Sequence, residues 1–258
     1  MRTRLIGALT GAALLAPLAG CGVTVDTGDG PVAARSTASS GASGDRLTRT
    51  QLRSALLGTA DVGKGFAEDP HHIADSFYID CLVGFDDLTG MPHPHAAETR
   101  YIAADTDDGA PATRQSVAEY GSVSDARNAL SRYALAMHGC GTAKDHDGRD
   151  FVHLRVDAND QRTISGVDQE TNVAATGADT FKGEDYDQGI WTTAVRVGRY
   201  VAVVTYVDAD VKEYGVVDGF GAALLSRLDA VIDRRPVQPM HSLDLEVTEF
   251  EDGPHNHA

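Results

Sequence analysis

Histidines are the side chains of this sequence best suited to bind a transition metal, and there are ten of them. Three groups stand out, at His71 and His72, at His93 and His95, and at His255 and His257. Neutral imidazole is a good metal ligand, and acidic residues such as Asp69, Asp75 and Glu98 lie near the first two groups. The spacing fits no standard zinc pattern, and a site needs several ligands held together. Solvated loop histidines are therefore favoured, and we predict no metal and no cofactor.

Runs of acidic residues raise the question of calcium. They occur at residues 105–108, 145–147 and 157–160. Calcium loops place oxygen ligands at alternating positions around a glycine turn and end on a bidentate glutamate. The last run matches only a fragment of that pattern, so polar turns are the favoured interpretation of all three.

The sequence also lacks the common catalytic motifs. The sequence contains neither Gly-x-Ser-x-Gly nor Ser-x-x-Lys, and it has no phosphate loop or dinucleotide fingerprint. We therefore predict no catalytic residue. Trp191 and Tyr206, which lie on strands predicted below, are candidates for lining a ligand groove, although a core or sheet-face position is the more common use of such rings.

The N-terminus has the pattern of a signal peptide. Two arginines in the first four residues precede an apolar run from Leu5 to Leu18. This run is shorter than the about 20 apolar residues of a membrane-spanning helix. A charged start and a short apolar core are typical of a secretory leader.

The leader ends in Leu18, Ala19, Gly20 and Cys21, which resembles the lipobox of bacterial lipoproteins. In that class the cysteine thiol receives a diacylglyceryl group and a peptidase cuts before it. The resemblance implies a signal peptide over residues 1–20, lipidation at Cys21 and attachment to the extracytoplasmic face of the cell membrane. Two acyl chains suit stable anchoring, because one chain anchors only marginally.

Cys81 and Cys140 are the other two of three cysteines. In an oxidising compartment such a pair normally becomes a disulfide. A two-thiolate metal site or a redox pair usually has Cys-x-x-Cys spacing, so a structural disulfide is favoured over both.

The composition restricts the partners. Apolar residues make up 42% of the chain, which is enough for a buried core. The net charge is −16, and removal of Arg2 and Arg4 would make the chain more acidic still. Nucleic acid binding requires clustered Lys and Arg, so we exclude it. The expected partners are the membrane, through the N-terminal lipid, and an unknown small-molecule or envelope ligand.

Local patterns predict the elements of one folded domain. Residues 21–45 are rich in Gly, Ser, Ala and Thr and are predicted to form a flexible tether. We predict helices over residues 47–57, 124–137 and 211–232, short strands over 99–104, 115–120, 151–156 and 162–167, and a hairpin over 190–207 that turns near Gly198. Residues 58–96 are turn-rich.

Hairpins outnumber crossover units in this order, which predicts an α+β fold with a mainly antiparallel sheet packed by about three helices. The folded domain is predicted to span residues 46–235, followed by an acidic tail containing histidines at 236–258.

Four segments in this order resemble the PknH-like extracellular sensor domain, which occurs on receptor kinases and on free lipoproteins of actinomycete-type bacteria. They are the leucine-rich opening at residues 47–57, the strand, turn and helix at 115–130, the cysteine after that helix, Cys140, and the closing hairpin at 195–204. The resemblance implies an extracellular domain that senses a ligand in a cleft of its sheet.

Together these features predict a membrane-anchored extracytoplasmic lipoprotein with a non-catalytic, ligand-binding or sensor-like domain. Two alternatives remain open. One is a lipid or metal carrier, which a deep apolar pocket would favour. The other is a hydrolase with a scattered site, which a Ser–His–Asp contact would favour.

Overall fold

Helix α3 (Val123–Gly139) shows most clearly how the sequence directs the fold. In the computed structural model, the Ser122 hydroxyl caps the helix by accepting the Asp125 backbone N–H at 3.1 Å. Its buried residues are three and four positions apart, which places them along one side of the helix. They are Ala126, Ala129, Leu130, Tyr133 and Met137.

The structure describes residues 46–70, 78–85, 88, 90–104, 111–147, 150–181, 184–208 and 215–239. Its other helices are α1 (Arg49–Ala55), α2 (Thr59–Val62) and α4 (Gly215–Ile232). The main strands are β1 (Ala67–Glu68), β4 (Ala96–Ala103), β5 (Ala112–Glu119), β6 (Thr142–Asp147), β7 (Asp150–Asn159), β8 (Gln169–Phe181), β9 (Glu184–Val197) and β10 (Tyr200–Asp208). A separate small hairpin pairs β2 (Tyr78–Ile79) with β3 (Leu82–Val83).

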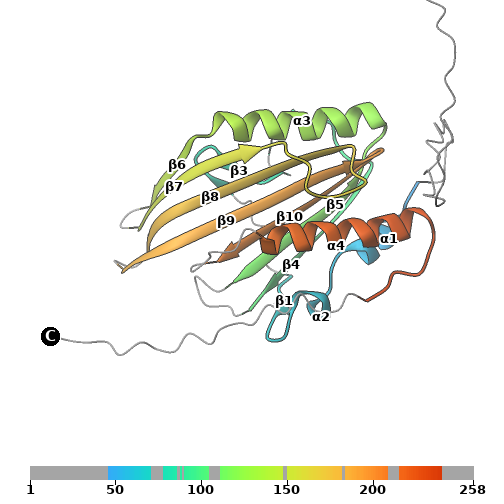
Figure 1. Cartoon of the computed structure of the whole chain (residues 1–258), viewed down its shortest axis with the longest axis horizontal. Coiled ribbons are helices and arrows are strands. Elements are labelled where there is room, and N and C mark those ends of the chain that lie inside the picture. The colour runs from blue at the N-terminus through green and yellow to red at the C-terminus, as the bar shows by residue number, and fades with distance from the viewer. Residues whose placement is uncertain are drawn as a thin grey trace, which may run out of the picture. The chain divides into compact units, whose positions relative to one another are not determined.

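The eight main strands form one antiparallel sheet in the order β1-β4-β5-β10-β9-β8-β7-β6 (Figure 1). The predicted α+β class is confirmed: a single domain contains this sheet and three helices longer than one turn, with the four-residue α2 in addition. The hairpin β9–β10 turns at Gly198, as predicted, where φ is +57°, a conformation that glycine adopts at little cost.

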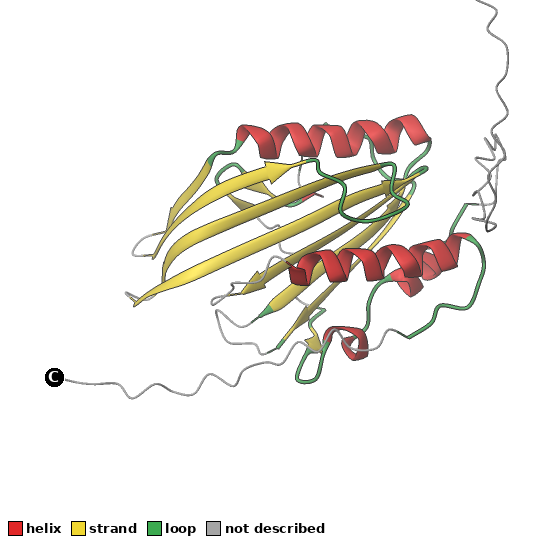
Figure 2. Cartoon of the chain, viewed as in Figure 1, coloured by secondary structure: helices red, strands yellow, loops and turns green. Residues whose placement is uncertain are grey.

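Both faces of the sheet are covered (Figure 2). Alternate residues of β9 point to opposite faces, so Trp191 and Val195 belong to one core and Ile190 and Ala194 to the other. Helices α1 and α4 cover the first face, and α3 covers the second (Figure 1). Buried aliphatic and aromatic side chains make up both cores, and their packing fixes the positions of the helices relative to the strands.

Polar side chains within the sheet attach the N-terminal helix to the first face. Glu119 is completely buried, accepts the Leu47 backbone N–H at 2.8 Å and forms an ion pair with Arg199 at 3.0 Å. Gln115, also buried, accepts the Leu57 N–H at 2.7 Å and donates to the Leu57 carbonyl at 3.0 Å. The two ends of the α1 segment are therefore fixed on β5.

One predicted element was wrong, and one long strand was missed. Residues 162–167 were predicted to form a strand but lie in the loop between β7 and β8, where Glu170 accepts the backbone N–H groups of Thr163 and Ile164. Strand β8 was not predicted as an element. Two further segments, residues 211–214 of the predicted last helix and residues 1–45, lie outside the described part of the chain.

Within the ranges given above, no helix combines the length and the apolar character needed to cross a membrane.

Candidate functional site

A cavity of about 350 Å³ opens between α3 and the loop that joins β7 to β8. We call it the α3 pocket. Its walls come from three elements of the described structure. They are α3, with Ser131, Ala134, Leu135 and His138, the loop, with Asp160 and Arg162, and the start of β8, with residues 169–171. The volume lies in the range of about 300–1,000 Å³ that is usual for small-molecule sites.

Helix spacing explains the α3 wall. Residues 131, 134, 135 and 138 are separated by three and four positions, so they lie along one side of the helix. This side borders the buried stripe, and Ala134 on it is half-buried. Leu135 is 75% exposed, and it is one of two large apolar side chains that are exposed among the described residues. The pocket therefore has an apolar side on the helix.

Asp160 holds the start of the loop between the helix and the sheet. Its Oδ2 lies 3.1 Å from His138 Nε2, and its Oδ1 accepts the Thr171 hydroxyl at 2.9 Å. Because an ionised carboxylate only accepts hydrogen bonds, the ring hydrogen of His138 lies on Nε2. Each oxygen of Asp160 thus accepts one hydrogen bond.

Gln169 connects the pocket to the buried end of β9. Its Nε2 donates to the Ser131 hydroxyl at 3.1 Å, and its Oε1 accepts from Arg196 Nε at 2.7 Å. Arg196 also donates to Asp168 at 3.0 Å and to the Gly198 carbonyl at 2.9 Å. Burial lowers the pKa of the Arg196 guanidinium, and the charge of Asp168 partly offsets that effect.

The side chain of Glu170 points to the face of the sheet opposite to that of Gln169 and Thr171, and it accepts hydrogen bonds from the loop. It accepts the Thr163 hydroxyl at 2.6 Å, the Ile164 N–H at 3.0 Å and the Asn172 amide at 2.8 Å. Burial by itself would raise the pKa of Glu170, but these donors outweigh it, and the pKa lies below its usual value. Burial and the nearby charge of Glu170 raise the pKa of Asp218.

A serine, a histidine and an aspartate are present in the α3 pocket, but they do not form a catalytic triad. Ser131 and His138 are two helical turns apart, or about 10.5 Å along the axis. The Ser131 hydroxyl accepts from Gln169, and the Nε2 of His138 faces Asp160. A triad requires the histidine to contact the serine on one side and the acid on the other, so these residues provide binding groups and no activated nucleophile.

Trp191 and Tyr206 do not line an open groove, which corrects the expectation from the sequence. They are 3% and 5% exposed and belong to the core beneath α4. Their ring centroids are 6.4 Å apart, and the Tyr206 ring lies 5.9 Å from that of Phe220. A Cβ atom at Gly189 would lie 1.7 Å from Trp191 Cη2, so the indole covers this glycine. The strong alternation of the hairpin reflects burial on both faces.

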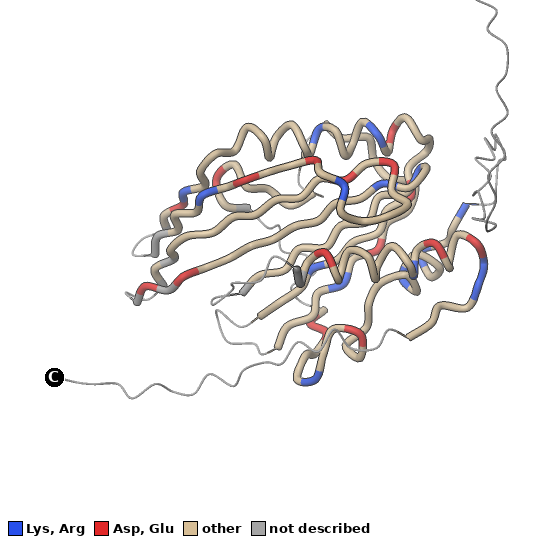
Figure 3. Tube along the Cα trace, viewed as in Figure 1, with Lys and Arg blue, Asp and Glu red and all other residues tan. Residues whose placement is uncertain are grey.

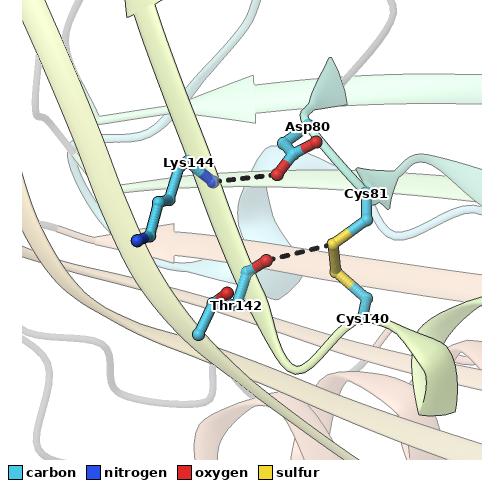
Figure 4. Close-up of a disulfide and its surroundings, with 5 residues drawn as sticks. All are labelled: Asp80, Cys81, Cys140, Thr142 and Lys144. Atoms are coloured by element: carbon cyan, nitrogen blue, oxygen red, sulfur yellow. Dashed lines mark hydrogen bonds between the residues drawn. A yellow bond between two sulfur atoms is a disulfide. The ribbon is translucent and has the colours of Figure 1, made fainter.

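The predicted disulfide is confirmed. Cys81 and Cys140 are joined, with their Cα atoms 5.5 Å apart (Figure 4). Beside it, the Lys144 backbone N–H donates to Asp80 at 3.3 Å, and the Cys81 sulfur lies 3.2 Å from the Thr142 carbonyl oxygen. The bond therefore holds the β2–β3 segment against β6 and the end of α3.

The remaining predicted site residues are scattered or undescribed. Cys21, His71, His72, His255 and His257 lie outside the described residues, as does the acidic run at 105–108. His95 hydrogen-bonds to Arg46. Among the described residues, no three His, Cys, Asp or Glu side chains gather into a group that could hold a metal ion.

The α3 pocket was not predicted from the sequence, although Leu135 was one signal of it. Leu135 lies outside the apolar stripe of its helix, so its side chain is not needed for the core. The partners across the pocket, Asp160 and Arg162, come from a loop whose position depends on long-range hydrogen bonds, and no local pattern predicts those.

Comparison with known proteins gives a fold relative and no family. The chain is similar to the crystal structure of the extracellular domain of PknH from Mycobacterium tuberculosis, with a TM-score of 0.50 and 12% sequence identity. The match covers 71% of this chain and 97% of that domain. No family model matches the sequence, and no curated protein matches it. At this identity the likeness shows a shared fold, that of an extracellular domain.

Proposed function

We propose that this protein is a lipoprotein of the cell envelope that binds a small ligand in the α3 pocket without turning it over. The observation that carries the proposal is the pocket itself. It is open, it lies between a helix and a loop, and its polar walls are held in place by hydrogen bonds to the sheet. Such pre-formed concave sites with a few fixed polar groups are the usual form of small-molecule sites.

Three independent features support this location. The N-terminal sequence resembles a lipoprotein leader ending at Cys21. The Cys81–Cys140 disulfide suits an oxidising compartment. The fold is shared with an extracellular domain. In this proposal residues 21–45 are the tether, 46–235 the binding domain and 236–258 the tail.

Anchoring is tested by fractionating cells that express the Cys21→Ser variant. We expect this variant to leave the membrane fraction or to remain unprocessed, and the wild type to carry the mass of a diacylglyceryl group on a chain beginning at Cys21. Identical fractionation and migration of the two proteins would rule out the lipid anchor.

Binding is tested by ligand-observed NMR with a panel of small carboxylic acids, alkylamines, monosaccharides and dipeptides. The chain from residue 22 onward is suitable, because every described helix and strand lies in one compact unit that begins at Gly44. We expect at least one class to bind, and Ala134→Trp, which fills the pocket, to abolish that binding. Val123→Trp, on the exposed start of the same helix, is the matched control. If nothing binds, or if Ala134→Trp has no effect, the pocket is not the site.

A further inference from the structure

The carboxylates beside the α3 pocket already accept hydrogen bonds. Asp160 accepts one at each oxygen, from His138 and from Thr171. Both oxygens of Glu170 accept from the loop and from Asn172. A ligand that offered only donors would therefore have to share these oxygens with the partners that they already have.

Donor groups, in contrast, remain available. Arg162 lines the pocket and makes no hydrogen bond or ion pair within the described residues. The Ser131 hydroxyl accepts from Gln169 and so keeps its own hydrogen for a further partner. A guanidinium and a hydroxyl on opposite walls match the oxygens of a carboxylate or a phosphate.

Arginines also gather beside the pocket, although the whole chain carries −16. Arg127 on α3 and Arg162 on the loop both lower the pKa of Arg196, which means that the three guanidinium groups are close enough to interact. Figure 3 shows basic positions on α3, on this loop and near the β9–β10 turn. Screening shortens the reach of distant surface charges to about 8 Å at physiological salt, so the charges beside the pocket determine its field. Among them, the carboxylates of Asp160 and Glu170 have donor partners, whereas Arg162 has none among the described residues.

The helix wall adds an apolar contact surface. Leu135 is three-quarters exposed at the rim, and the half-buried Ala134 lies beside it. Covering an exposed leucine removes apolar area from water, which favours a ligand with an apolar part.

From these observations we infer that the ligand of the α3 pocket is a small anion with a short apolar group. Its acid group binds Arg162 and the Ser131 hydroxyl, and its apolar group lies on Leu135 and Ala134. This inference rests on the proposed function and specifies its ligand class. The acidic chain would be repelled by anionic headgroups at a bilayer surface, so the ligand is a free molecule and not a membrane lipid.

Three probes separate the contributions: octanoate has both parts, acetate has only the acid, and octylammonium has the apolar chain with the opposite charge. For the chain from residue 22 onward, isothermal titration calorimetry should show binding of octanoate, acetate binding at least about tenfold weaker, and no detectable octylammonium binding. Sedimentation with phosphatidylglycerol vesicles should leave the protein in solution. Co-sedimentation that Arg162→Gln abolishes would overturn the free ligand in favour of a lipid headgroup.

Matched variants assign the contacts. Arg162→Gln should weaken octanoate binding about tenfold, because a hydrogen bond to a charged group is lost. Leu135→Ser should weaken it about threefold. Two controls on the same helix should stay within about twofold. Arg132→Gln removes an exposed arginine that lies against Gly90, and Val123→Ser removes the other exposed apolar side chain.

The inference and the proposed function fail in different ways. If octylammonium binds as tightly as octanoate and Ala134→Trp blocks both, the pocket binds ligands but the anionic class is wrong. An unchanged octanoate affinity in Arg162→Gln would overturn the placement of the acid group. If no probe of either charge binds, and the broader NMR panel is also negative, the proposed function falls together with this inference.

Discussion

Removing the Cys81–Cys140 disulfide should greatly reduce the stability of the domain. The bond closes a loop of 59 residues, and the chain-entropy model gives about 4 kcal/mol for a loop of this length. Domains of this kind are stable by about 5–15 kcal/mol in total. The Cys81→Ala/Cys140→Ala double variant should therefore lose a large share of its free energy of unfolding.

The assay is urea unfolding of the chain from residue 22 onward, followed by far-UV circular dichroism and by the fluorescence of Trp191, the single tryptophan. The wild type treated with a reducing agent should unfold at the same urea concentration as the double variant, since both lack the same cross-link. A double variant within about 1 kcal/mol of the oxidised wild type would show that the cross-link adds little stability, because residual structure in the unfolded chain would then offset the loop entropy.

Three further predictions test the packing and the charges of the fold. Trp191 fluorescence should resist quenching by iodide, and Gly189→Ala should shift its emission and cost about 2 kcal/mol in urea unfolding, because the new methyl group collides with the indole; an unchanged emission would mean that the ring does not cover Gly189. Glu119→Gln should cost about 2 kcal/mol, because a buried charged acceptor is lost; a change below about 0.5 kcal/mol would contradict the anchoring of the N-terminal helix on β5. Because the pKa of Glu170 is lowered, this group stabilises the fold above the pKa of an unfolded glutamate, and that stability is lost as the pH falls through the folded value. Because the pKa of Asp218 is raised, this group costs stability at neutral pH, and the cost disappears on acidification. Asp218→Asn should therefore raise the melting temperature at pH 7 and leave it unchanged at pH 3, and the opposite pH trend would show that the sign is wrong.

The sequence predicted those elements whose patterns are local. Helix α3 combines a serine cap with an apolar stripe, and it was found within two residues of its observed bounds. The β9–β10 hairpin combines alternation with a turn at Gly198, and it was found with its turn, although β9 begins at Glu184, six residues before the predicted start. The last helix was predicted from apolar residues at helical spacing, and residues 217, 220, 224, 225 and 228 are buried in α4. These features depend on neighbours within a few positions.

The parts that were missed depend on distant partners. Residues 162–167 alternate in the manner of a strand. The carboxylate of Glu170, however, accepts the backbone N–H groups of Thr163 and Ile164, which holds this segment as a loop. Strand β8 contains Glu170, Thr171 and Asn172, polar residues that are buried because they bond to that loop and to neighbouring strands. Local hydrophobicity does not reveal such burial.

The candidate site was misplaced for a related reason. Large aromatic residues on a strand suit either a groove or a core, and only the position of α4 shows that Trp191 and Tyr206 are in the core. The α3 pocket is formed by one exposed leucine and by polar residues that come together only in the folded chain.

The most direct test of the account is an amide chemical-shift map of the chain from residue 22 onward during titration with octanoate. We predict that the perturbed amides gather at residues 131–138, 160–162 and 169–171, around the α3 pocket. The α4 face, which includes Trp191 and Tyr206, should remain unperturbed. Shifts concentrated on residues 190–207 and 217–228, or spread evenly over the domain, would contradict the assignment of the α3 pocket as the binding site.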